Sequence, residues 1–476
     1  MHRASAFHFA SAILAVTFGV LIATSQVTVL DSAAMLGVGA LVAVGGLVIG
    51  VRRSRAEYGY VDIFHPLIFP LGYVAVTFLA PAWAMLVTGR NFLGFTSSVM
   101  APNTALLMTL AVTGVTLGLA VKFPCREHNP ATAPDPRFLT HVGRIVLLLL
   151  VAIAAQGYLT GSVLTRGVGQ TTYGAAETVQ ALMTILTPLA VVLLASAHRA
   201  TTPKGLLRPV DWVLLVGLIC FLGLGGGRGQ GITVLLVLVY GGTRKRIRTG
   251  ALAASFGAIL AFAVGVLQYR GIARGGSPSS STSIALLTDW SVATYTTGIT
   301  AQGVPSKMDF QWGSTYLASA LRQLPSPVAN RILGQPYDTG TYAFRRLIAF
   351  ENPNQGWAYS LPAEGYLNFG VAGMIAACFL FGLFMAWAWS RASWPAPGVT
   401  ALVYPVLMAF LPVALRSDAL GLIKSVLYPV LIATAIYAVA RAAQHRLPER
   451  RPMSRLASGR RRPGFPDASG VAITPQ

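Results

Sequence analysis

The chain has 476 residues, of which 54% are hydrophobic and only 11% are charged. This composition excludes an ordinary soluble protein, and repeated apolar runs of about twenty residues are typical of a polytopic helical membrane protein. The formal net charge of +21 would suit a nucleic-acid-binding protein, but the basic residues are placed in the connectors between apolar runs. The sequence therefore predicts an all-α transmembrane bundle with membrane lipids, and no nucleic acid, as its surroundings.

Twelve apolar segments are predicted to be transmembrane spans. They lie near residues 8–30, 33–51, 63–87, 103–121, 143–163, 178–197, 210–225, 230–242, 251–269, 362–389, 399–415 and 420–440. Spans 1–9 would occupy residues 1–269 and spans 10–12 residues 362–440, with a large loop, residues 270–361, between spans 9 and 10. The basic tail, residues 441–476, is polar and Pro-rich, which predicts disorder.

The placement of positive charge predicts the topology. With the N-terminus inside, two thirds of the 36 lysines and arginines fall on the inner side. Short inner loops rich in Lys and Arg fix this orientation, and their charge also attracts anionic lipid. Both termini are therefore expected in the cytoplasm, and the loop 270–361 is expected outside the cell membrane.

A short hairpin at residues 210–242 contains the sequence GGGRGQG, with Arg228 at its centre. Basic clusters on both sides are expected in the cytoplasm, so each arm spans only roughly 20 Å of a hydrocarbon core about 30 Å thick. An arginine at that depth should face a wet cavity or an anionic partner, and the flanking glycines expose backbone N–H groups that suit a phosphate or diphosphate. The alternative is that Arg228 reaches outward to the lipid headgroups.

The loop 270–361 is rich in Trp and Tyr, which predicts a folded cap that holds a site rather than a disordered linker. Several arginines in or near it are not required by the topology and are candidates for binding an anion. They are Arg270, Arg274, Arg345, Arg346 and Arg416. Arg345 and Arg346 could equally lie on a solvated face, and Arg416 could pair with Asp418. Asp338 is either a catalytic acid or a turn residue.

The sequence AEGYLNFGVAG places Glu364 where the loop is expected to become a helix. Pro362 is suited to a helix start, and Glu364, Asn368 and Val371 would then share one helical face. Glu364 is a candidate general base. Alternatively, it is an acid in a first helical turn, where a negative charge is favourable without any function.

Metal and cofactor chemistry is not expected. All seven histidines lie outside the expected outer loops. The long loop also has no Asp-x-Asp motif or similar pair of acids that would indicate a site for a divalent cation. No disulfide framework is expected either, because none of the three cysteines lies in the loop.

Together, the glycine–arginine turn, the AEGYLNFGVAG segment and the single large late loop resemble the O-antigen polymerases, the Wzy-type oligosaccharide repeat-unit polymerases, and the related O-antigen ligases. The ligases usually carry a histidine in the large outer loop, and this loop has none. That departure favours the polymerases over the ligases.

The resemblance implies an enzyme of the bacterial inner membrane in the biosynthesis of a cell-envelope polysaccharide. It would be a glycosyltransferase that polymerises undecaprenyl-diphosphate-type lipid-linked oligosaccharides outside the cytoplasm, with other polysaccharide-assembly proteins as possible partners. The residues assigned to the diphosphate are Arg228, Arg270, Arg274, Arg345, Arg346 and Arg416. Glu364 or Asp338 would be the base. Two other functions are retained as alternatives: a ligase-like glycan transferase, and a transporter or flippase of lipid-linked glycans.

Overall fold

The computed structural model describes residues 29–88, 102–124, 135–159, 175–201, 207–224, 228–243, 257, 261, 282–324, 328, 331–332, 338–348, 359–392 and 398–446. The described part is helical throughout and contains no strand. Its helices are α2 (Val29–Tyr58), α3 (Phe69–Thr88), α4 (Pro102–Ala120), α5 (Pro136–Leu159), α6 (Ala175–Thr201), α7 (Pro209–Leu224), α8 (Arg228–Thr243), α10 (Thr282–Gly303), α11 (Ser314–Leu321), α13 (Gly340–Leu347), α14 (Leu361–Arg391), α15 (Val399–Ala414) and α16 (Ala419–Arg446).

Six of these helices are long and apolar enough to cross a membrane: α2, α3, α4, α5, α14 and α16. Shorter apolar segments occur in α6, α7 and α15. The architecture is therefore that of a helical membrane protein, as the composition predicts. The expected span 8–30 and nearly all of the expected span 251–269 lie outside the described residues, as does the tail after residue 446, so the number of twelve spans stays a prediction.

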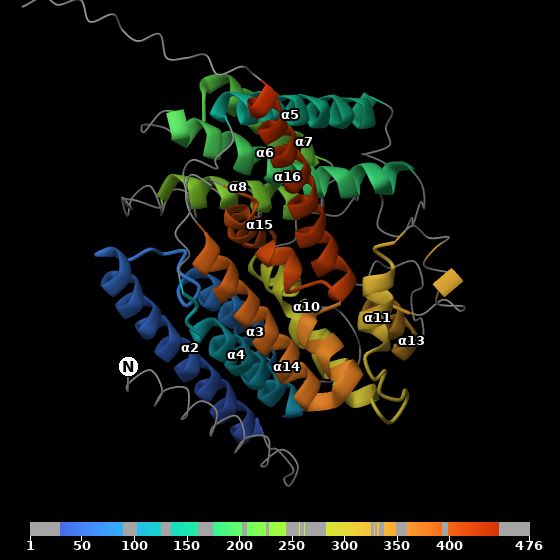
Figure 1. Cartoon of the computed structure of the whole chain (residues 1–476). Coiled ribbons are helices and arrows are strands. Elements are labelled where there is room, and N and C mark those ends of the chain that lie inside the picture. The colour runs from blue at the N-terminus through green and yellow to red at the C-terminus, as the bar shows by residue number, and fades with distance from the viewer. Residues whose placement is uncertain are drawn as a thin grey trace, which may run out of the picture.

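The helices form two groups with separate hydrophobic cores. One core lies among α2, α3, α4 and α14, and the other lies among α5, α6, α7, α8 and α16. Helix α15 contributes to both, with Tyr404 and Leu407 in the first core and Leu402 and Phe410 in the second. In Figure 1, α5, α6 and α8 run across the view, whereas α2 and α14 run obliquely. Helices α5, α6 and α8 of the second group therefore cross α2 and α14, and the helices do not form one parallel bundle.

Helices α4 and α14 make the most extensive helix pair. A Cβ atom added at Gly118 would overlap the backbone of α14 near Phe379, and one added at Gly382 would overlap the backbone of α4 near Val115. A Cβ at Gly114 would lie only 2.9 Å from the Ile375 carbonyl oxygen. Small residues spaced four apart allow this close approach, which is a common way for helices to associate in membranes.

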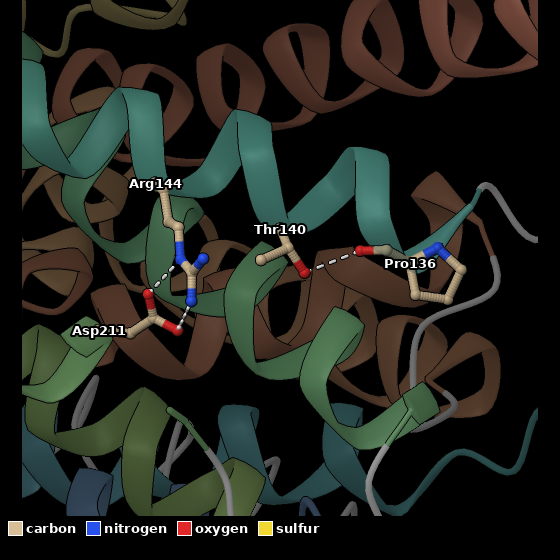
Figure 2. Close-up of polar contacts among 4 residues, drawn as sticks. All are labelled: Pro136, Thr140, Arg144 and Asp211. Carbon is tan, nitrogen blue, oxygen red and sulfur yellow. Dashed lines mark hydrogen bonds and ion pairs between the residues drawn. The ribbon is translucent and has the colours of Figure 1, made fainter. Parts of the chain in front are cut away.

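In the second group, α5 and α7 are joined by an ion pair (Figure 2). Arg144 donates from Nε to Asp211 Oδ1 at 2.6 Å and from NH2 to Oδ2 at 3.2 Å. Asp211 is buried in the first turn of α7, where the helix dipole also favours a negative charge. Two parallel hydrogen bonds fix the direction in which α5 crosses α7.

The described part of the segment expected as a cap loop begins with the long helix α10, at residue 282. Helix α10 packs against α3, α4 and α14, and its threonines at positions 294, 296, 297 and 300 are all buried. Thr297 and Thr300 donate to carbonyl oxygens one turn earlier, at 2.7 Å each, so these hydroxyl groups are satisfied inside the helix. The first part of the cap thus lies among candidate spans, and α11 and α13 form the part beyond them.

Helix α14 is broken near its start, which corrects one sequence expectation. Phe369 has φ −141° and ψ 22°, and Gly370 has φ 65° and ψ −151°, so the helical path is interrupted there. The left-handed φ at Gly370 is one that glycine adopts without a steric cost. Glu364 and Asn368 do share a face, but Val371 follows the break and does not continue it. Gly365 packs against Gly373 across the bend.

Candidate functional site

Glu364 lies at the centre of the candidate site. Its side chain has no exposed surface and receives hydrogen bonds from three other segments. The Thr315 hydroxyl donates to Oε1 at 2.8 Å, and the Ala419 backbone N–H donates to Oε2 at 2.5 Å. The Gly340 backbone N–H is a further donor to this carboxylate. Helices α11, α13, α14 and α16 therefore meet at one acid.

Asn368 connects this acid to the break in α14. Its Nδ2 donates to the Thr315 hydroxyl at 2.7 Å and to the Glu364 carbonyl oxygen at 2.8 Å. Its Oδ1 accepts from the Gly313 N–H at 2.8 Å. The backbone carbonyl of Asn368, left without its helical partner by the break, accepts from the Trp312 N–H at 3.1 Å. Segment 311–313 thus satisfies the backbone groups that the break exposes.

Asp418 is a second buried acid next to Glu364 and interacts with it electrostatically. Its Oδ2 accepts from the Thr341 N–H at 3.1 Å, and its Oδ1 accepts from the Gly421 N–H at 3.0 Å. Asp418 therefore caps the start of α16 and joins it to the start of α13. Arg416, a sequence candidate for the diphosphate, is half-buried in the turn two residues earlier.

Helix α13 and the residue two positions before it include three of the sequence candidates. Asp338, just before the helix, forms an ion pair with Arg346 at 2.6 Å, and the Arg346 side chain is 53% exposed. The neighbouring Arg345 is half-buried, with its guanidinium 5.3 Å from the centroid of the Tyr342 ring. Because Gly340 at the start of the same helix contacts Glu364, the structure brings Asp338, Arg345 and Arg346 into the region of the candidate base.

Arg322, at the end of α11, belongs to the same group although it was not a sequence candidate for the diphosphate. Its guanidinium also lies 5.3 Å from the Tyr342 ring centroid, so one tyrosine is shared by Arg322 and Arg345. A cation held on an aromatic face keeps its charge and a defined position. Only the contact between α11 and α13 reveals this residue, because the two segments are distant in sequence.

Trp312 is a further residue that the sequence did not single out. It has φ 47°, an uncommon conformation for a non-glycine residue, and its side chain is 74% exposed. Its ring packs edge-on against Phe310 at 6.0 Å and against Phe369, at the helix break, at 6.2 Å. Strained backbone that positions an exposed aromatic side chain is often found at functional sites.

A network of buried hydroxyl groups supports the site from α10. The Ser360 hydroxyl lies 2.8 Å from the Thr296 hydroxyl, and the Tyr359 hydroxyl lies 3.1 Å from the Thr300 hydroxyl. Burial raises the pKa of the Tyr359 phenol well above its usual value, so the side chain remains protonated. The segment that leads into Glu364 is therefore fixed by neutral hydrogen bonds.

Several sequence candidates cannot be compared with this arrangement. Arg270 and Arg274 lie outside the described residues. Arg228 is the first residue of α8, a helix that packs on α6, α7 and α15, but its side chain is not described.

Within the described ranges, no group of three or more His, Cys, Asp or Glu side chains is arranged to hold a metal ion.

The arrangement offers a carboxylate, a group of guanidinium groups and an exposed aromatic surface at the same end of α14. Another molecule can contact the Glu364 carboxylate only after neighbouring residues move, because the carboxylate has no exposed surface. Comparison of the chain with protein-family models, with curated proteins and with solved structures found no match in any of the three.

Proposed function

We propose that the protein is a membrane glycosyltransferase that polymerises polyprenyl-diphosphate-linked oligosaccharide repeat units on the extracytoplasmic face of a bacterial inner membrane. The proposal rests on one observation above all. The Thr315 hydroxyl donates to the buried Glu364 carboxylate and accepts from Asn368, and the backbone carbonyl of Asn368 accepts from the N–H of the exposed Trp312, at the break of an apolar helix that is long enough to cross a membrane.

In this proposal Glu364 is the general base. It accepts the proton of an acceptor hydroxyl, whose oxygen then forms the new glycosidic bond while the bond from the donor sugar to the lipid diphosphate breaks. The diphosphate leaves with the electron pair of that bond. General-base catalysis of this kind contributes about 10²–10⁴-fold to the rate. Asp338 is the alternative base, and in the described structure its carboxylate is paired with Arg346.

The arginines stabilise the negative charge on the leaving diphosphate. Arg345 and Arg322 are held at Tyr342, and Arg346 and Arg416 belong to segments joined by the Thr341–Asp418 hydrogen bond. Fixed guanidinium groups bind phosphate oxygens with charge-assisted hydrogen bonds, so they lower the energy of the departing group. Arg228, Arg270 and Arg274 are proposed to complete this set.

The Trp312 surface supports a glycan substrate in particular. Sugars present C–H groups that pack on aromatic rings, and Phe310 and Phe369 hold the exposed Trp312 ring in place. The amphipathic ring of a tryptophan also suits the membrane–water boundary, where such residues gather. Both roles support the proposal that this end of α14 lies at the membrane surface, which is where the diphosphate of an embedded lipid lies.

Reconstitution of the purified protein with a single synthetic polyprenyl-diphosphate-linked repeat unit tests the proposal. A polymerase uses this one compound as donor and acceptor, and it produces a ladder of longer glycans on the lipid. A ligase-like transferase gives no ladder and transfers the glycan only when a separate acceptor is added. A transporter moves the lipid-linked unit across the bilayer without lengthening it. Either of the last two results would contradict the proposal.

A tryptophan pair provides the matched control. Trp312→Ala should raise the substrate concentration for half-maximal polymerisation by about threefold to tenfold, the effect of losing an aromatic contact worth about 0.5–1.5 kcal/mol. Trp212→Ala removes a tryptophan that is 39% exposed at the start of α7, on the expected cytoplasmic side, and should leave the reaction unchanged. Equal effects of the two substitutions would assign Trp312 to the bilayer boundary alone.

A further inference from the structure

A second polar region lies at the other end of α14. The C-terminal ends of α2, α4 and α14 converge there, because Arg53 NH1 donates to the Ala120 carbonyl oxygen at 2.7 Å and one cavity is lined by residues of all three helices. These are the ends where the sequence places basic residues expected in the cytoplasm. The convergence joins spans that are far apart in sequence around one small cavity.

The cavity has a polar side and an apolar side. Its polar lining residues are Arg53, Lys122, His65, Glu57 and Ser390, so two cations exceed one acid, and its apolar lining includes Leu119, Ala386 and Trp389. The Arg53 guanidinium has five N–H donors and uses one of them on Ala120, so it can also bind an anion. Lys122 is 71% exposed and pairs weakly with Glu57 at 3.5 Å, a contact that a stronger acceptor can replace.

His65 adds a neutral donor to this cavity. The imidazole is only 5% exposed, and its ring packs edge-on against Trp389 at 5.7 Å. Its Nδ1 accepts from the Leu67 N–H at 3.3 Å, so the proton of the neutral ring is on Nε2. The cavity is thus lined by a buried imidazole with an N–H group, by two cations and by the indole ring of Trp389.

We propose that this cavity binds the headgroup phosphate of an anionic phospholipid in the cytoplasmic leaflet. Arg53, Lys122 and His65 contact the phosphate, and the first carbon atoms of the lipid lie against Leu119, Ala386 and Trp389. Basic cavities between helix ends on the cytoplasmic side suit such headgroups. The lipid, rather than free phosphate, is the occupant because the cavity lies at the end of three apolar helices, where headgroups are found, and because Leu119, Ala386 and Trp389 are among its lining residues.

Native mass spectrometry of the full-length protein with added phosphatidylglycerol tests the proposal. In about 0.2 M ammonium acetate, charges more than about 10 Å away are largely screened, so cations at the cavity are distinguished from the general surface field. Removing both Arg53 and Lys122 (Arg53→Gln with Lys122→Gln) should weaken binding of the first lipid by about 25-fold, at about fivefold for each charge.

The control is Arg52→Gln with Arg55→Gln, which removes two exposed cations from the same turn of α2 without changing the cavity lining. These two arginines share a helical turn with Arg53, so screening does not remove their attraction, and the control should weaken lipid binding by less than about fivefold, against about 25-fold for the cavity variant. Equal losses in the two double variants would overturn the proposal, because attraction would then be general to the surface. If Arg53→Gln prevents folding, Lys122→Gln and Arg55→Gln are compared singly, with a loss of about fivefold expected for Lys122→Gln and a smaller loss for Arg55→Gln, and equality again overturns the proposal.

Two further ligands identify the occupant. Phosphatidylcholine, which has the same phosphate but no net charge, should bind at least about tenfold more weakly than phosphatidylglycerol. Equal binding would overturn the role of the cations. Millimolar inorganic phosphate, at matched ionic strength, should not displace phosphatidylglycerol, and displacement would overturn the choice of a lipid as the occupant. These readouts do not depend on glycosyl transfer.

Discussion

The two ends of α14 differ in charge, burial and connection. At its start, Glu364 and Asp418 are buried acids whose hydrogen-bond donors come mostly from backbone N–H groups of α13 and α16. At its end, Arg53 and Lys122 are accessible cations around a small cavity. A buried acid needs several fixed hydrogen-bond donors, so the start of α14 makes many polar contacts with neighbouring helices. Cations that water and lipid can reach need fewer such contacts.

The net charge of the chain does not distinguish the two ends of α14, whereas their burial and contacts indicate a different function for each end. The accessible basic end follows the pattern expected for the cytoplasmic side of a membrane protein, and its charge needs no catalytic explanation. The acids and the arginines of α11 and α13 do not follow that pattern. They are the residues whose presence the proposed glycosyl transfer explains.

The largest expected effect is at the acidic end. Glu364→Gln keeps the size of the side chain but removes its ability to accept a proton, so polymerisation by the purified enzyme should fall by about 10²–10⁴-fold. The assay uses matched lipid-linked substrate, with donor binding measured separately and expected to change little. Glu57→Gln, which removes an acid at the basic end, should leave turnover within about twofold, because Glu57 takes no part in transfer.

A different result would move the assignment. If Glu364→Gln retains turnover within about threefold of the wild type, far less than the loss expected for a general base, Glu364 is a structural acid that organises α13 and α16. Asp338 then becomes the candidate base, and the Asp338→Asn variant should show the loss of turnover.

The next effect tests how tightly the acidic end is packed. A Cβ atom at Gly340 would lie 2.8 Å from Cδ of Glu364 and 3.0 Å from a ring carbon of Tyr359. Gly340→Ala should therefore lower the free energy of unfolding by about 1–3 kcal/mol, the usual cost of overpacking. Gly37→Ala in α2 is the control, because a Cβ there meets nothing within 4 Å. Similar thermal stability of both variants in detergent would contradict the close packing around Glu364.

The smallest effect belongs to the basic end and depends on pH. Burial, with a smaller contribution from Arg53, lowers the pKa of His65 from 6.5 to about 4. The unfolded chain therefore binds a proton at a higher pH than the folded protein does. The contribution of the neutral, buried His65 ring to the free energy of unfolding is therefore present above the unfolded pKa of about 6.5 and is lost as the pH falls toward 4. Between pH 7 and pH 6 the loss is about 0.7 kcal/mol.

Thermal unfolding at the two pH values measures this effect. The His65→Gln variant lacks the titrating ring, and its free energy of unfolding should fall by about 0.7 kcal/mol less than that of the wild type between pH 7 and pH 6. An unchanged pH dependence in the variant would show that His65 is not protonated preferentially in the unfolded chain.

The sequence predicted much of the first helix group and part of the site. Apolar length located α2, α4 and α14, and Pro362 correctly indicated where α14 begins. The break at Gly370 was missed because a Phe-Gly pair inside an apolar run also fits an unbroken helix. Helix α10 was missed because its threonines are polar, and only the structure shows that carbonyl groups of the same helix satisfy them.

The remaining features depend on contacts between distant segments. Thr315, Gly340 and Ala419 reach Glu364 from three helices, and no local pattern relates them. Arg322 and Arg345 meet at Tyr342 for the same reason. The sequence could thus indicate that Glu364 and the arginines of the loop deserve testing, but the partners of Glu364 follow from tertiary packing.

The central claim is that the acidic end of α14 lies outside the cytoplasm and the basic end inside it. Its direct test is cysteine labelling in a variant whose three native cysteines have been replaced. Lys307 and Arg55 are both exposed and belong to the acidic and basic ends, respectively. A membrane-impermeant maleimide should label Lys307→Cys in intact spheroplasts and Arg55→Cys only after permeabilisation. Labelling of Lys307→Cys only after permeabilisation would contradict the account.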